Sequence, residues 1–145
     1  MHILGSKRLP MPTRNQLKQL ALLRRRETQV LFDAQMFDGA RYLAGYVLEL
    51  ALKARICRLL DSEEYPESGS FRRVYATHDL DQLLKLAGLR RKLSLQQRVL
   101  FDRWSTAALW RPERRYDVPG SAKRDDVRDI LAAVDEVLKW IKRYW

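Results

Sequence analysis

Residues 38–54 read DGARYLAGYVLELALKA, and they contain the longest apolar stretch of the sequence. Its apolar residues recur at spacings of three and four, and between positions 42 and 52 they cover most sides of a helix. A helix that is apolar almost all round is a buried helix, so we expect it to be the central element. Asp38 is its predicted N-cap, and the helix is predicted to run to about Leu60. Gly45 would let a neighbouring element approach closely.

The sequence before this stretch predicts another long helix. Thr13 and Gln16 match the capping-box pattern, in which each side chain satisfies a backbone N–H group at a helix start. Apolar residues then recur at helical spacing to about Gln35. Residues 1–12 are predicted to be a flexible leader, and residues 13–145 are predicted to form one domain.

Immediately after the central stretch, residues 61–77 lack any period and predict a long surface loop. A short helix is expected from Asp79 to about Ala87. Gly88 is placed to end that helix in a left-handed conformation.

The C-terminal part predicts two more long helices. Ser94 and Gln97 form a second capping-box pair, which predicts a helix that reaches Trp110 and stops at Pro112. Ser121 is the predicted N-cap of the last helix. No strand-like alternation is present, so the predicted class is all-α: an up-and-down bundle of four long helices plus one short helix.

The composition limits the partners. The 145 residues hold 28 Lys+Arg against 18 Asp+Glu, a net charge of +10 that suits a polyanion such as RNA or a nucleotide. One cysteine and two histidines exclude a disulfide framework and leave too few ligands for a metal site, so no metal or cofactor is expected. No apolar stretch is long enough to span a bilayer and no signal peptide is evident, which predicts a cytoplasmic protein without a membrane contact.

The first candidate site is on the central helix. Glu49 and Lys53 are spaced i,i+4 with the acid first, and Arg41 precedes them by two turns on nearly the same face. They form either an ordinary ion pair on a partly exposed face or a charged pair held in a groove, where burial would give it a functional role.

The second candidate is the loop that begins at Trp110. Arg111, Arg114 and Arg115 can bind phosphate, while Trp110 and Tyr116 can stack on bases. The alternative is that the two aromatic residues anchor the core and the arginines solvate the turn.

The third candidate is His78 with Arg73 before it. Histidine can act as an acid or a base near neutral pH, and a nearby arginine could stabilise charge on a phosphate. The alternative is that His78 only precedes the Asp79 helix cap.

These residues together resemble a known family. The run 38–54 resembles the signature helix of HEPN domains, and the similarity continues in HDLDQLL at 78–84, in Trp104 and in the Arg-Arg-Tyr run at 114–116. It covers roughly residues 13–144.

The resemblance implies an up-and-down bundle that dimerises. HEPN domains include metal-independent ribonucleases of toxin–antitoxin, CRISPR and phage-defence systems, and non-catalytic partners of nucleotidyltransferases. Their catalytic signature is an arginine and a histidine separated by four to six residues, near the start of the last long helix. Here Tyr116 stands five residues after Arg111, and the formal match, Arg73 to His78, lies elsewhere. In some toxins of this family a tyrosine receives a nucleotidyl group, and Tyr116 is the comparable residue.

Three functions remain open. The first is an RNA- or nucleotide-binding HEPN protein of a defence or toxin–antitoxin module, with the Arg–His motif absent or degenerate. The second is an active metal-independent endoribonuclease that uses His78 and a nearby arginine. The third is a non-catalytic dimeric interaction module for a nucleotidyltransferase or another partner, suggested by the aromatic residues Trp140, Tyr144 and Trp145.

Overall fold

The computed structural model describes residues 10–95 and 98–145. The central stretch forms α2 (Phe37–Leu59), and its residues from Ala44 to Cys57 are buried at almost every position. This confirms the expectation that a helix apolar on most sides lies at the centre of the protein.

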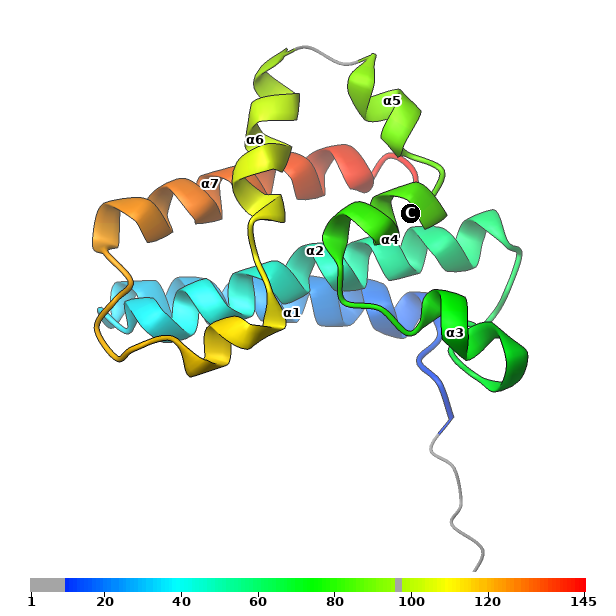
Figure 1. Ribbon diagram of the computed structural model, residues 1–145, viewed down its shortest axis with the longest axis horizontal. Helices are drawn as coiled ribbons and strands as arrows, with labels where there is room; N and C mark the ends of the chain where they lie inside the picture. Colours follow the sequence, from blue (N-terminus) through cyan, green and yellow to red (C-terminus); the bar gives the residue numbers. More distant parts are fainter. Residues whose placement is uncertain (1–9, 96–97) are drawn as a thin grey trace, which may run out of the picture.

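Two other long helices pack on α2. α1 (Arg14–Asp33) runs antiparallel to α2, whereas α7 (Arg124–Ile141) runs in the same direction as α2 (Figure 1). α7 has an amphipathic pattern, and its apolar face, which includes Val127, Val134 and Ile141, is buried in the core.

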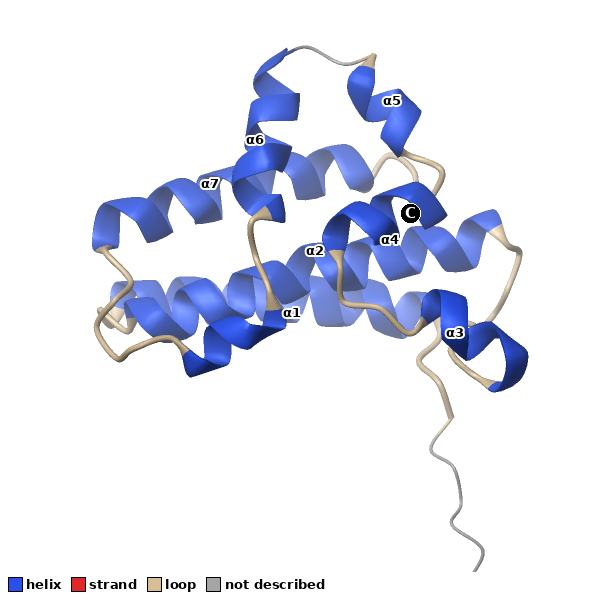
Figure 2. Cartoon of the chain, viewed as in Figure 1, coloured by secondary structure: helices blue, strands red, loops and turns tan. Residues whose placement is uncertain are grey.

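The remaining elements are short. They are η1 (Gly69–Phe71), α3 (Arg72–Tyr75), α4 (Leu80–Leu86), α5 (Arg90–Ser94), α6 (Arg98–Ala108) and η2 (Pro112–Tyr116). α4 packs on α2 and α6 packs on α7, while α5 and the start of α6 project from the bundle (Figure 1). Residues 10–95 and 98–145 contain helices and loops but no strand, which confirms the all-α class (Figure 2).

Two predicted helix ends are confirmed in detail. The backbone N–H of Gln16 donates to Thr13 Oγ1 at 3.2 Å, and the backbone N–H of Thr13 donates to Gln16 Oε1 at 2.9 Å, which is a complete capping box. Gly88 has a φ of +67° and follows α4, as the left-handed ending requires.

Two predicted N-caps are wrong. α2 begins one residue before Asp38 with Met36 as its N-cap, and α7 has Lys123 rather than Ser121 at that position. The Asp38 carboxylate instead connects the start of α2 to the segment before α7. It accepts hydrogen bonds from the backbone N–H groups of Gly120 and Ala122 at 2.6 and 3.0 Å.

The region 61–97 also differs from the prediction. The expected loop at 61–77 contains the two short helices η1 and α3. Ser94 lies inside the additional helix α5, where its hydroxyl donates to the carbonyl of Arg90, so it does not start α6; its expected partner Gln97 lies outside the described residues. Short helices of four or five residues have too few positions to show a period in the sequence.

The C-terminal aromatic residues pack on the protein itself. Trp140 is buried, and Trp145 lies beside α1, where Lys18 stands 5.5 Å from its ring centroid and Arg14 donates to its carbonyl. Within the described ranges, no helix is both long enough and apolar enough to cross a membrane.

Candidate functional site

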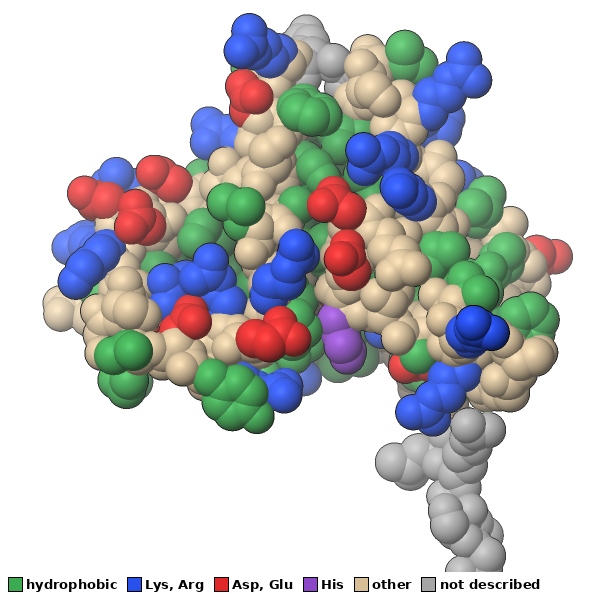
Figure 3. Space-filling view, in the orientation of Figure 1, with side chains coloured by type: hydrophobic (Ala, Val, Ile, Leu, Met, Phe, Trp, Pro, Cys, Tyr) green, Lys and Arg blue, Asp and Glu red, His purple; other side chains and the backbone are tan. Residues whose placement is uncertain are grey.

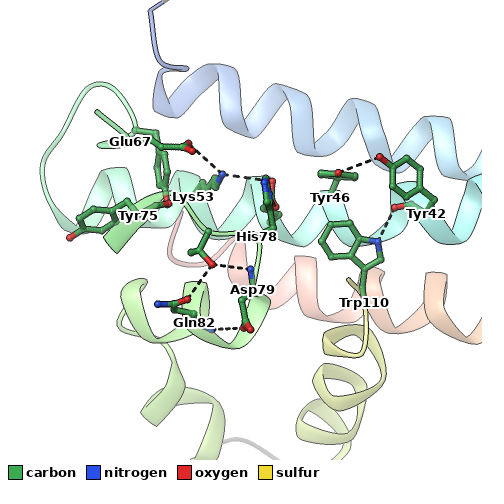
Figure 4. A network of polar contacts seen from close by, with 12 residues as sticks. Tyr42, Tyr46, Lys53, Glu67, Tyr75, His78, Asp79, Gln82 and Trp110 are labelled. Atoms are coloured by element: carbon green, nitrogen blue, oxygen red, sulfur yellow. Dashed lines mark hydrogen bonds and ion pairs between the residues drawn. The ribbon is translucent and has the colours of Figure 1, made fainter. Parts of the chain in front are cut away.

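Four polar side chains lie along one face of α2. Tyr42, Tyr46, Glu49 and Lys53 follow one another at spacings of four, three and four, which places them in a row along the helix. Figure 4 labels Tyr42, Tyr46 and Lys53 of this row, together with His78 on the loop that precedes α4.

Glu49 holds His78 in a fixed orientation. Nδ1 of the imidazole lies 2.5 Å from Glu49 Oε1, and the Glu49 side chain is only 5% exposed whereas that of His78 is 56% exposed. Because a carboxylate can only accept a hydrogen bond, Nδ1 carries the hydrogen and Nε2 is left available to another partner. A buried carboxylate that orients an exposed imidazole is an arrangement suited to acid–base chemistry.

Lys53 stabilises the buried carboxylate from the other side. Its Nζ lies 3.7 Å from Glu49 Oε2 and 3.8 Å from Glu67 Oε2, and it stands 4.9 Å from the ring centroid of Tyr65. The Lys53 side chain is only 9% exposed. Lys53 is therefore surrounded by protein groups and contributes to the site by neutralising Glu49 rather than by contacting a ligand.

Tyr46 and Tyr42 extend the row toward η2. Their hydroxyl oxygens are 3.4 Å apart, and burial together with this hydrogen bond raises the pKa of Tyr46 to about 12. The Tyr46 phenol is therefore protonated at neutral pH and can donate a hydrogen bond.

Arg115 lies at this end of the row and is exposed. Its guanidinium stands 4.8 Å from the ring centroid of Tyr116, and hydrogen bonding to the phenol of Tyr116, with a smaller effect of Tyr42, raises the pKa of Arg115. Among residues 10–95 and 98–145, no carboxylate forms an ion pair with Arg115.

Arg111 lies near His78. Its Nη1 lies 3.9 Å from Oδ2 of Asp79, the residue that follows His78 and caps α4. We call the group formed by Tyr46, Glu49, His78, Arg111 and Arg115, with Tyr116 beside Arg115, the His78 surface. In the space-filling view the histidine, coloured purple, lies in a hollow flanked by basic and acidic side chains (Figure 3).

The structure separates two predicted arginines from this surface. Arg41 and Arg114 both bind Asp117, at 2.9 and 3.2 Å, and Arg41 also donates to the Ser121 hydroxyl. These two arginines line a different pocket of about 370 Å³ beside α6 and α7. The polar site that Arg41 was expected to share with Glu49 is therefore not formed, because Asp117 and Ser121 compete for the guanidinium.

Trp110 is not a base-stacking residue. It is buried between α2 and the end of α6, and its indole N–H donates to the backbone carbonyl of Tyr42 at 2.8 Å. The alternative interpretation, a core anchor, is the one the structure shows. Arg73 lies exposed on α3, and none of the polar contacts in the described part of the chain connects it with His78.

Two residues of the row, Tyr42 and Tyr46, were missed as site residues. Their sequence signal was the spacing of four, three and four that they share with Glu49 and Lys53, which places the four side chains on one face of the helix. What the spacing could not show is that the loop carrying His78 crosses that face.

Comparison with protein-family models, with curated proteins and with solved structures found no match to this chain. Within the described ranges, no group of three or more His, Cys, Asp or Glu side chains is arranged to hold a metal ion. The chemistry of the His78 surface therefore has to be argued from its own geometry.

Proposed function

We propose that the protein binds RNA or a nucleotide at the His78 surface. The observation that carries this proposal is the exposed pair of Arg115 and Tyr116, because Arg115 lacks a carboxylate partner in the described chain and the Tyr116 side chain is 76% exposed. A cation and an aromatic ring held together in solvent can bind a phosphate and stack on a base at the same time. Arg111 supplies a second positive charge near His78.

The resemblance to HEPN domains supplies the proposed biological setting. On that basis the chain is a cytoplasmic HEPN-type protein of a prokaryotic defence or toxin–antitoxin module. It would act as a homodimer, with a nucleotidyltransferase or another protein of the module as its partner.

Binding is tested with a short fluorescein-labelled single-stranded RNA and fluorescence anisotropy. We expect the double variant Arg111→Ala/Arg115→Ala to bind at least about tenfold more weakly than the unaltered protein, because it loses two phosphate contacts. The matched control is Arg26→Ala/Arg143→Ala, which removes the same charge from exposed positions on α1 and after α7. Equal losses in both double variants would show that the basic surface as a whole, and not the His78 surface, binds the RNA.

The contact between Glu49 and His78 favours a second candidate function, metal-independent cleavage of RNA. In that reaction the ribose 2′-oxygen attacks the adjacent phosphorus and the 5′-oxygen of the next nucleotide leaves. Nε2 of His78 would accept the 2′-hydroxyl proton or donate a proton to the leaving oxygen. Arg111 would stabilise the charge on the phosphate.

Cleavage is tested by incubating the protein with RNA in the presence of a chelator. We expect His78→Ala to abolish cleavage. Glu49→Gln, which keeps the shape but not the charge, should reduce cleavage by about 100-fold or less, since orientation of the imidazole is impaired rather than lost. Cleavage that survives His78→Ala, or an unaltered protein that cleaves nothing, contradicts this candidate and leaves the binding proposal to its own test.

A further inference from the structure

A second surface, which shares Arg111 with the His78 surface, lies between α4, α5 and α6. It is a groove of about 410 Å³ whose lining includes Leu84, Leu93, Phe101, Trp104 and Leu109. We call it the α5–α6 groove. Each helix contributes residues at spacings of three or four, so the groove is built from helix faces and not from one loop.

The floor and the edge of the groove differ in exposure. Leu84, Leu93 and Trp104 are buried and form the floor. Phe101 and Leu109 are 49% and 70% exposed, so large apolar side chains stand open to solvent at the edge. Exposed apolar side chains at the edge of a groove are typical of a protein-binding site.

The charge of the groove is positive. Arg90 and Arg111 line it, and Arg91 follows Arg90 on the exposed side of α5. The acidic residue in the lining, Asp81, is already engaged, because the indole N–H of Trp104 donates to its Oδ1 at 3.1 Å. Arg111 lies 3.9 Å from Asp79, whereas Arg90 forms no ion pair within the described residues, so an incoming acidic group would pair first with Arg90.

We infer that the α5–α6 groove binds an acidic, amphipathic helical segment of another protein. Apolar side chains of the segment would cover Phe101 and Leu109, and its Asp or Glu residues would face Arg90 and Arg111. α6 has 11 residues and is about 16 Å long, which matches about three turns of a bound helix. A second copy of this chain is a poorer fit on charge, because each copy carries a net charge of +10.

The inference is tested by selecting random peptides, long enough for about four helical turns, on the immobilised full-length protein. We expect the enriched peptides to carry net negative charge and apolar residues at positions i, i+3, i+4 and i+7. Selected peptides are then labelled, and their dissociation constants are measured by fluorescence anisotropy. Enrichment of neutral or basic peptides, or no enrichment over an empty surface, would overturn the inference.

Two variants test whether the selected peptides bind in the α5–α6 groove. Phe101→Ser and Arg90→Glu should each weaken peptide binding by about tenfold. Their matched controls, Val30→Ser and Arg26→Glu, alter exposed residues of α1 and should leave the dissociation constant unchanged. Phe101 and Arg90 are not buried, and circular dichroism melting curves show whether each variant is folded. Folded variants that bind the peptides as tightly as the unaltered protein would overturn the assignment.

Other occupants of the groove give different results. Light scattering that shows a dimer lost in Phe101→Ser would identify a second copy as the occupant. RNA that displaces the selected peptides, with RNA binding lost in Phe101→Ser, would identify nucleic acid. Since His78→Ala and Arg115→Ala leave the groove intact, peptide binding that persists in those variants separates this inference from the function proposed for the His78 surface.

Discussion

The missing side chain of Gly45 allows α2 to meet Trp110. A Cβ atom at position 45 would lie 1.8 Å from Cδ2 of the Trp110 indole and 2.1 Å from Cγ, which is far inside van der Waals contact. Trp110 cannot move aside without losing its hydrogen bond to the Tyr42 carbonyl. We expect Gly45→Ala to lower the free energy of unfolding by about 3 kcal/mol, measured by urea denaturation, because overpacking a core displaces its neighbours.

Gly39, on the same helix, is the matched control for this substitution. A Cβ atom there would lie 3.4 Å from Cδ1 of Leu31, an ordinary contact. Because alanine has a higher helix propensity than glycine, Gly39→Ala should leave the free energy of unfolding unchanged or raise it by up to about 1 kcal/mol. Equal destabilisation by both substitutions would mean that backbone freedom in α2, and not the indole, requires the glycines.

Asp38 connects two elements, because it joins the start of α2 to the segment that leads into α7. The backbone N–H groups of Gly120 and then Ala122 lower the pKa of its carboxyl below the usual 3.8. A folded-state pKa below the unfolded-state pKa contributes stability above the unfolded-state value, and this stability is lost as the pH falls through the folded-state value.

This connection predicts how stability depends on pH. Asp38→Asn should lower the free energy of unfolding at neutral pH, since an amide accepts the two N–H groups less strongly than a carboxylate. The difference between variant and unaltered protein should shrink as the pH falls below about 4, where the carboxyl becomes protonated in the unfolded state. Urea denaturation across this pH range measures it, and a difference independent of pH would contradict the ionic role of Asp38.

The long elements could be predicted from the sequence, whereas the site could be predicted only in part. α1, α2 and α7 have apolar periods long enough to mark them, and the Thr13 capping box located the start of α1. The Glu49–Lys53 pair and His78 were identifiable as two separate candidates. Their meeting depends on how the loop before α4 crosses α2, which is a long-range contact that local pattern does not determine.

Local sequence pattern also does not show that the residues of the loop after Trp110 lie in different surroundings. Its aromatic and basic residues are adjacent in sequence, but the turn of η2 directs them to different surroundings. Arg114 points to Asp117, Arg115 to Tyr116, and Trp110 into the core. Composition indicated a basic, aromatic segment, and only the packing decides which of its residues remain available to a ligand.

At the scale of the whole molecule, the net charge is +10. In the part of the chain that the structure describes, some arginines form ion pairs with carboxylates and others do not. Arg25, Arg41 and Arg114 each bind an aspartate within the protein. Paired charges attract a polyanion less than free ones, so the formal charge overstates the number of groups available for phosphate binding. The proposed binding surface therefore lies within a generally basic exterior.

The salt dependence of RNA binding distinguishes a local surface from a diffuse one. Each phosphate contact to a single strand contributes about 0.7 to the slope of log affinity against log salt concentration, since it releases a counterion. Arg111→Ala/Arg115→Ala should therefore reduce the slope by about 1.4, whereas Arg26→Ala/Arg143→Ala should leave it unchanged although both double variants have the same net charge. Anisotropy titrations at several salt concentrations provide the slopes. If both double variants reduce the slope equally, phosphate contacts are spread over the basic exterior, and the His78 surface has no special part in holding the strand.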